Sequence, residues 1–109
     1  MSAVKIYSNN DEMIPLKFQL SQNFPNPFKE KTIIKYCVAY KTDIQISIYN
    51  SNGKLIKRVT KDKQEAGTYE IEFNASTLPD GIYYYQLKAG QAGKQEAELT
   101  VMKEMNIQN

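Results

Sequence analysis

The chain is short of the residues on which most enzymatic and metal chemistry depends. It has no histidine, no tryptophan and a single cysteine, Cys37, among its 109 residues. Without histidine it lacks the usual general base and the commonest metal ligand. One cysteine excludes an internal disulfide, and a reactive thiol would need a neighbouring base. We therefore expect no enzymatic activity, no cofactor and no metal, and interpret Cys37 as a small residue on a strand.

The sequence also lacks a long apolar run and a strong charge of one sign. No apolar stretch approaches the roughly 18–20 residues that cross a membrane as a helix. The balance of 14 basic and 12 acidic residues leaves a formal net charge of +2, which gives no reason to expect a nucleic-acid partner. Residues 1–10 are polar and lack the apolar core of a signal peptide. The chain is therefore expected to be either cytoplasmic or cut from a longer precursor.

What the sequence does contain is a series of short segments in which apolar and polar residues alternate. This alternation has the period of a half-buried strand. It is clearest where Ile44, Ile46 and Ile48 are expected to face inward. Asn52 and Gly53 then suit a tight hairpin that returns the chain along the same strand. The expected strands are 16–20, 32–38, 43–50, 54–59, 67–73, 82–88 and 95–103.

About seven short strands without an amphipathic helix predict an all-β fold, an immunoglobulin- or fibronectin-III-like β-sandwich of about seven antiparallel strands. The sandwich is expected over residues 16–103. Residues 1–15 are expected to be a linker or precursor remnant, and 104–109 a frayed tail. The polar stretch 61–66 is expected to be a loop. In the last strand Ala97, Leu99 and Val101 are expected to face the core.

Two segments mark the shape of the domain. In residues 22–28, two prolines exclude a helix and hold the residues before them extended, with Phe24 and Phe28 as the expected core anchors. In residues 78–83, a Leu-Pro-Asp-Gly sequence suits a β-turn. The tyrosine that follows it stands where such sandwiches place a hydroxyl that bonds back across the corner. The residues assigned to these structural motifs are Pro25, Asn26, Pro27, Phe28, Pro79, Asp80, Gly81 and Tyr83.

Three of the eight tyrosines, Tyr40, Tyr49 and Tyr84, fall on positions predicted to be exposed. Exposed aromatic rings can stack on sugars or form a protein-binding hot spot, but they can equally pack across strands and stiffen a sheet. A carbohydrate- or protein-binding module of a secreted protein is therefore an alternative function. A structural spacer that associates through its edge strands is a third.

Read in order, several motifs resemble the C-terminal sorting domain of the type IX (Por) secretion system, type A, of Bacteroidetes. These domains are related to the immunoglobulin-like domain of the flagellar hook-capping protein. The resemblance covers about residues 16–103. The segments that carry it are QNFPNPF at 22–28, TIIKY at 32–36, IYN at 48–50 with Gly53, AG at 66–67 and LPDGIY at 78–83.

The resemblance implies a seven-stranded sandwich at the end of a larger secreted cargo protein. It also implies a signal that is read in the periplasm and directs passage through an outer-membrane translocon. A sortase-like peptidase of the outer membrane then usually removes the domain upstream of its first strand and attaches the cargo to lipopolysaccharide. The cargo is therefore expected at the outer membrane surface or outside the cell.

Recognition in the family depends on the extreme C-terminus, which implies a role for the last strand. The residues so assigned are Glu98, Leu99, Thr100, Val101, Met102 and Lys103. This sequence departs from the family pattern twice. Ala97 and Glu98 stand where lysines are usual, and residues 104–109 run past the expected end.

Overall fold

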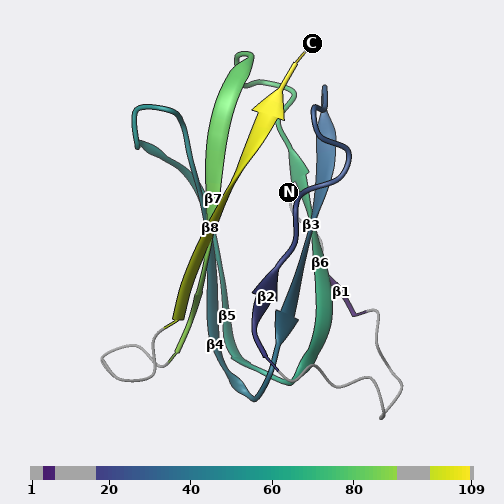
Figure 1. Cartoon of the computed structure of the whole chain (residues 1–109), viewed down its shortest axis with the longest axis vertical. Coiled ribbons are helices and arrows are strands. Elements are labelled where there is room, and N and C mark those ends of the chain that lie inside the picture. Colours follow the sequence, from purple (N-terminus) through teal and green to yellow (C-terminus); the bar gives the residue numbers. More distant parts are fainter. Residues whose placement is uncertain (1–3, 7–16, 91–98, 109) are drawn as a thin grey trace.

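The computed structural model describes residues 4–6, 17–90 and 99–108 and shows two β-sheets packed face to face (Figure 1). The pairings between named strands are all antiparallel, and the described residues contain no helix. The predicted all-β sandwich is confirmed. In the first sheet the strand order is β1 (Val4–Ile6), β6 (Gly67–Asn74), β3 (Lys31–Val38) and β2 (Gln19–Leu20). In the second sheet the strand order is β5 (Leu55–Gln64), β4 (Thr42–Tyr49), β7 (Gly81–Ala89) and β8 (Leu99–Ile107).

The core lies between the two sheets and is built from alternate residues of four central strands. Because successive side chains of a strand point to opposite faces, each of these strands supplies three large aliphatic or aromatic residues to the core. All of them are at most 4% exposed. The prediction that Ile44, Ile46 and Ile48 of β4 face inward is thereby confirmed. The inward residues of the other three strands are Ile34, Tyr36 and Val38 on β3, Tyr69, Ile71 and Phe73 on β6, and Tyr83, Tyr85 and Leu87 on β7.

The hairpin between β4 and β5 forms where expected, although of the pair Asn52 and Gly53 only Gly53 has a positive φ. Gly53 has a φ of +84°, in the region that glycine favours, and the side-chain oxygen of Asn50 accepts hydrogen bonds from the backbone N–H groups of Asn52 and Lys54. The expected polar loop over 61–66 is wrong, because β5 continues to Gln64. β5 is an edge strand and is largely exposed, so it does not need alternating apolar residues. Its charged residues therefore resemble a loop in the sequence.

The C-terminal end also differs from expectation, because β8 runs to Ile107 and residues 104–107 are not a tail. Met105 and Ile107 are 1% and 0% exposed and lie opposite Tyr83 and Gly81 of β7. Leu99, expected to face the core, is 38% exposed. The last strand keeps the predicted phase, since Val101 packs against the core, but its fully buried residues lie beyond Lys103. The expected inward residue Ala97 lies outside the described residues.

The N-terminal part adds an unexpected strand. Val4–Ile6 pairs with β6, Val4 lying opposite Ile71, within the stretch expected to be a linker. The other residues of 1–15 lie outside the described part of the chain. The expected strand 16–20 is shorter than predicted, since β2 consists of Gln19–Leu20 only.

Candidate recognition surface

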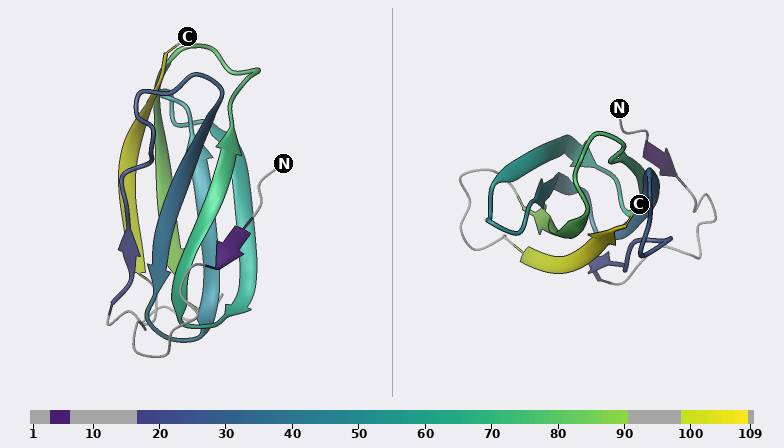
Figure 2. Two further views of the ribbon diagram at one scale, coloured as in Figure 1. Left: turned by 90° about the vertical axis from the view of Figure 1, so that its right-hand side faces the viewer. Right: turned by 90° about the horizontal axis from the view of Figure 1, so that it is seen from above.

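Residues 22–28, here called the lead-in, leave one sheet and join the other. Phe24 exchanges two backbone hydrogen bonds with Ile33 of β3, at 3.0 and 2.9 Å. Four residues later, Phe28 forms a parallel bridge to Ile107 of β8. The peptide bonds before Pro25 and Pro27 are cis. Figure 2 shows β2 and the chain that follows it running beside β8. The lead-in therefore connects the edge strand of the first sheet to the edge strand of the second.

A buried polar network holds the lead-in against the core. Asn23 is 2% exposed, and its side-chain amide donates to the carbonyl of Pro25 and to the hydroxyl of Thr32. The Tyr85 hydroxyl accepts a hydrogen bond from the Asn23 N–H at 2.8 Å and donates one to the carbonyl of Ser21 at 2.6 Å. A tyrosine of β7 thus fixes a segment that begins on the opposite sheet.

The buried side-chain polar atoms of the described residues all have a partner, as a packed interior requires. Burial raises the pKa of Tyr85 to about 12, and the hydrogen bond from Asn23 opposes this rise. Sequence reasoning missed the network. The available signal was an asparagine directly before Phe-Pro, a polar residue at the point where the chain must turn inward.

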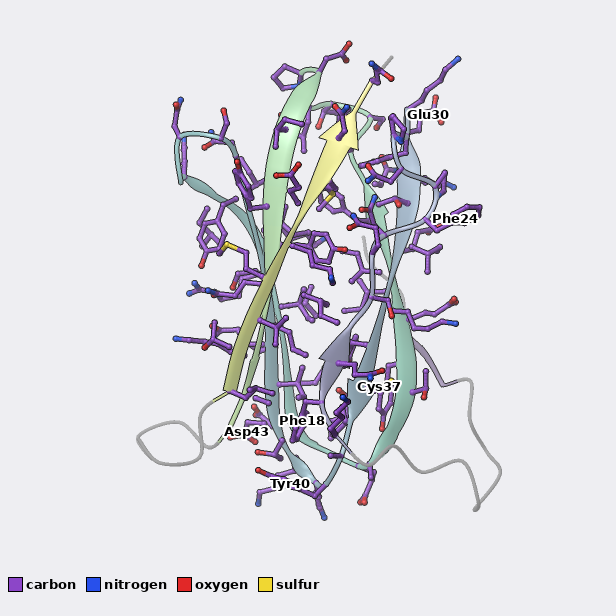
Figure 3. The ribbon with its side chains drawn as sticks, viewed as in Figure 1. Phe18, Phe24, Glu30, Cys37, Tyr40 and Asp43 are labelled. Carbon is purple, nitrogen blue, oxygen red and sulfur yellow. The ribbon has the colours of Figure 1, made fainter. Side chains whose placement is uncertain are left out.

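Of the two phenylalanines of the lead-in, one is a core anchor and the other is not. Phe28 is 3% exposed and its ring meets Phe73 edge-on, with centroids 6.4 Å apart. Phe24 is 78% exposed, so the prediction that it anchors the core is wrong. Since Asn23 takes the inward position, its neighbour must face out, as Figure 3 shows. Phe24 and Ile33 line a hollow of about 350 Å³ on the outer face of the first sheet.

The predicted hydrogen bond of the Tyr83 hydroxyl across the corner before β7 is present, but the hydrogen-bonded turn joins the Leu78 N–H to the Ala75 carbonyl and so precedes the predicted Leu-Pro-Asp-Gly turn. The Tyr83 hydroxyl donates to the carbonyl of Pro79 at 2.8 Å, and the Tyr83 side chain is 4% exposed. Pro79 and Asp80 are exposed, and Gly81 opens β7 opposite Ile107. In the lead-in, Pro25, Asn26 and Pro27 are likewise exposed. In both motifs the exposed residues lie next to a buried aromatic side chain, Phe28 in the lead-in and Tyr83 at the corner.

The predicted recognition residues of the last strand fall into two sets. Leu99, Thr100 and Met102 are exposed, while Val101 and Lys103 are half-buried and face the gap between the sheets. Glu98 lies outside the described residues. The described residues of this set, 99–103, follow one another along β8, which is an edge strand of its sheet.

The three tyrosines considered for ligand binding do not form one surface. Tyr49 and Tyr84 lie directly opposite each other on β4 and β7 and border a hollow of about 290 Å³ with Met102. Tyr40 lies beyond the other end of β4 and packs edge-on against Phe18, with ring centroids 5.0 Å apart. The contact between Tyr40 and Phe18 therefore joins two segments outside the strands, whereas Tyr49 and Tyr84 are cross-strand neighbours.

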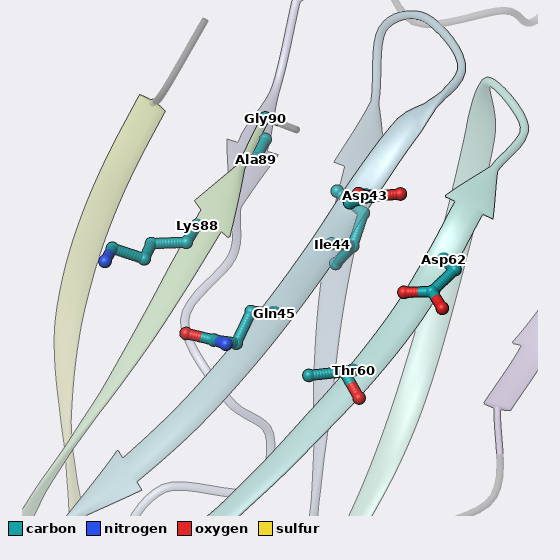
Figure 4. A pocket seen from close by; sticks show the side chains of 8 residues that line it. All are labelled: Asp43, Ile44, Gln45, Thr60, Asp62, Lys88, Ala89 and Gly90. Atoms are coloured by element: carbon teal, nitrogen blue, oxygen red, sulfur yellow. The ribbon is translucent and has the colours of Figure 1, made fainter. Parts of the chain in front are cut away.

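A further hollow, of about 190 Å³, lies at the start of β4 (Figure 4). The carboxylates of Asp43 and Asp62 line it together with Lys88, and Asp43 accepts a hydrogen bond from the backbone N–H of Lys63. Within 4–6, 17–90 and 99–108 there is no cluster of three or more histidine, cysteine, aspartate or glutamate side chains that could hold a metal ion.

The stacked pair Tyr36 and Tyr69 is the main aromatic contact inside the first sheet, with ring centroids 5.5 Å apart. Burial raises the pKa of Tyr36 to about 12, and a hydrogen bond donated to Gln64 opposes this rise. Burial also raises the pKa of Tyr69, and the nearby Glu65 adds to the effect. Both hydroxyls donate hydrogen bonds within the domain, Tyr36 to the Gln64 side chain at 2.8 Å and Tyr69 to the Glu65 carbonyl at 2.6 Å.

The family model for the secretion system C-terminal sorting domain matches residues 22–102, from the lead-in through the corner to the open part of β8. The chain belongs to this family. It is a C-terminal sorting domain of type IX secretion, the signal that sends a cargo protein for export. No curated protein sequence matches the chain. No helix among the described residues is long and apolar enough to span a membrane.

Solved structures share the fold of this sorting domain at low sequence identity. Dimeric latent PorU from Porphyromonas gingivalis matches with a TM-score of 0.65 and 19% identity, over 90% of this chain and 10% of that one. A β-glucuronidase from Parabacteroides merdae matches with a TM-score of 0.57 and 12% identity, over 84% of this chain and 14% of that one. CopC from Methylosinus trichosporium matches with a TM-score of 0.55 and 17% identity, over 84% and 93% of the two chains. The sorting domain thus spans about a tenth of the PorU chain.

Proposed function

We propose that this sorting domain carries a cargo domain, N-terminal to it, from the periplasm to the outer membrane surface or the extracellular space by presenting a folded surface to the type IX translocon and a sortase-like peptidase. The domain catalyses nothing itself. The observation that carries the proposal is the family match over residues 22–102, which includes both structural motifs and the first part of β8. A folded signal of this kind needs a rigid exposed surface, and the buried bonds of Tyr83 and Tyr85 supply the rigidity.

The recognition strip is proposed to be residues 98–103. Of the described residues in it, Leu99, Thr100 and Met102 expose their side chains on an edge strand. The lead-in covers the second half of the same strand, so the first half is the part that a receptor can reach.

The test is export of a reporter fused in front of the full 109-residue chain, behind a signal peptide, in a host that carries the secretion system. We expect the reporter at the cell surface or in the medium in amounts similar to those obtained with a sorting domain native to the host. Retention of a folded, protease-resistant fusion in the periplasm, while the native domain is exported, would contradict the proposal.

A matched pair of variants tests the recognition strip. Leu99 on β8 and Leu55 on β5 are 38% and 41% exposed and lie on opposite edges of one sheet. Leu99→Ser is expected to lower export several-fold, and Leu55→Ser is expected to leave it unchanged. Because both changes remove a similarly exposed leucine, an equal loss of export in the two variants would assign the effect to stability and not to recognition.

A further inference from the structure

The lead-in is bonded to the outer edge of β8 only in the second half of the strand, residues 104–107. The first half, residues 99–103, is here called the open half. In the second half, the Glu104 carbonyl accepts a hydrogen bond from the Gln22 side chain at 2.7 Å, and the Asn106 N–H donates to the Asn26 side chain at 2.9 Å. Phe28 pairs with the same edge, donating to the Asn106 carbonyl at 3.1 Å and accepting from the Gln108 N–H at 2.8 Å. The lead-in thus acts as a short added strand on β8.

The first half of this edge continues the same row of backbone groups. In an antiparallel ladder, alternate residues direct both their N–H and their C=O groups to the same side. The groups of Glu104, Asn106 and Gln108 that bond the lead-in turn away from β7, so the groups of Thr100 and Met102 must turn the same way. In the described part of the chain, no backbone partner lies on that side of Thr100 or Met102.

Along residues 99–102 this edge also carries none of the charges that protect an edge strand. Its residues Leu99, Thr100, Val101 and Met102 are uncharged and suit a strand, and the first charge comes at Lys103. The opposite edge of the sheet, β5, is a ten-residue strand that carries several lysines and an arginine, and charges of this kind discourage pairing with another chain. The described edge strands of the other sheet are two and three residues long.

A hollow of about 330 Å³ lies beside the open half, between it and the chain around β2. Among the described residues, its apolar lining comes from Phe18, Leu20 and Val101, and its charged lining from Lys17 and Lys103. A strand added to this edge would turn alternate side chains toward the apolar part of the hollow. The two lysines favour carboxylates on the added strand.

We propose that the edge from Leu99 to Lys103 binds an extended strand of a partner protein by strand addition, and that this strand combines apolar residues with aspartate or glutamate. In such addition, main-chain hydrogen bonds hold the peptide and the alternate side chains give selectivity. The assignment of this partner to the export machinery rests on the proposed function. The binding itself is a property of the isolated domain.

Binding is tested by amide NMR titration of the full chain with an acetylated octapeptide that has glutamate at positions 1 and 7, valine at positions 3 and 5 and threonine elsewhere, so that valine and glutamate side chains share the face turned to the hollow. We expect shifts confined to 99–103 and 17–21. The same peptide with alternate backbone nitrogens methylated, so that one edge cannot donate, and the same peptide with lysine in place of its two glutamates should each bind at least about tenfold more weakly. Shifts on another edge or face, or equal binding of the methylated peptide, would overturn the inference. These peptides act on the unaltered chain, so the result does not depend on a variant that folds.

A variant pair then tests the edge inside the cell. Thr100→Pro removes an N–H that faces away from β7 and blocks the edge, whereas Thr100→Ala keeps the N–H and is the control. Circular dichroism checks that both variants are folded. Of the two, only Thr100→Pro should then lose peptide binding and export. If Thr100→Pro loses peptide binding but is exported like Thr100→Ala, the machinery does not use this edge, and the sorting function still stands. If the unaltered chain binds the peptide but is not exported, the proposed function fails, and with it the assignment of the partner.

Discussion

Tyr85→Phe is expected to be the most costly removal of a single hydroxyl from this domain. The Tyr85 hydroxyl makes two hydrogen bonds, to the Asn23 N–H and the Ser21 carbonyl. A typical hydrogen bond contributes about 1 kcal/mol net, and a buried donor left without a partner costs about 1–3 kcal/mol. Asn23 is 2% exposed, so water cannot readily replace the lost partner. We expect the variant to lose about 2–3 kcal/mol of unfolding free energy.

Tyr83→Phe is the matched control, because it removes the same atom from the same face of the same strand. Its hydroxyl makes one hydrogen bond, to the carbonyl of Pro79, which is itself exposed. The expected loss is about 1 kcal/mol. At roughly 4–8 °C per kcal/mol for a small domain, the two variants should differ in melting temperature by several degrees.

Urea unfolding followed by far-ultraviolet circular dichroism measures both variants, since the chain has no tryptophan to report by fluorescence. The slope of free energy against urea should stay unchanged, because the surface exposed on unfolding is the same. If Tyr85→Phe costs no more than Tyr83→Phe at equal slopes, the lead-in is not held by the bonds through the core, and the reasoning above is refuted.

Three further predictions follow from the core and the edges. Burial raises the pKa of Tyr36 and Tyr85 from 10.0 to about 12, so between these values the folded state holds protons that the unfolded state releases. The contribution of these two tyrosines to the free energy of unfolding should be constant below about pH 10 and fall between pH 10 and 12. In urea unfolding measured across this pH range, Tyr36→Phe should make the fall less steep. Phe28→Ala should cost about 3–5 kcal/mol as a core truncation, whereas Phe24→Ala should change stability by less than about 0.5 kcal/mol; equal losses in urea unfolding would contradict the two placements. Deleting residues 104–109 removes two buried side chains and the partner of the lead-in, so the shortened chain should show no cooperative thermal transition, and a normal transition would restore the tail interpretation.

Alternation along the chain determined which side of each central strand faces the core. Ile44, Ile46 and Ile48 could be placed from sequence because the two-residue period of a strand is local, and the apolar side of the alternation marks the side that faces the core. The hairpin at Gly53 and the corner at Tyr83 were equally local, each needing only a few residues of known turn chemistry. The order and spacing of these local motifs were enough to indicate the family.

The tertiary structure decided what depends on residues far apart in the chain. Phe24 faces outward and Asn23 inward because Tyr85, more than sixty residues away, supplies the partner that the Asn23 N–H needs. Ile107 belongs to a strand because Phe28 and Gly81 pair with it. The same long-range pairing leaves the first half of β8 open and covers the second. A local pattern can show that a segment will be a strand, but only the strands beside it determine where that strand ends and which of its edges remains free.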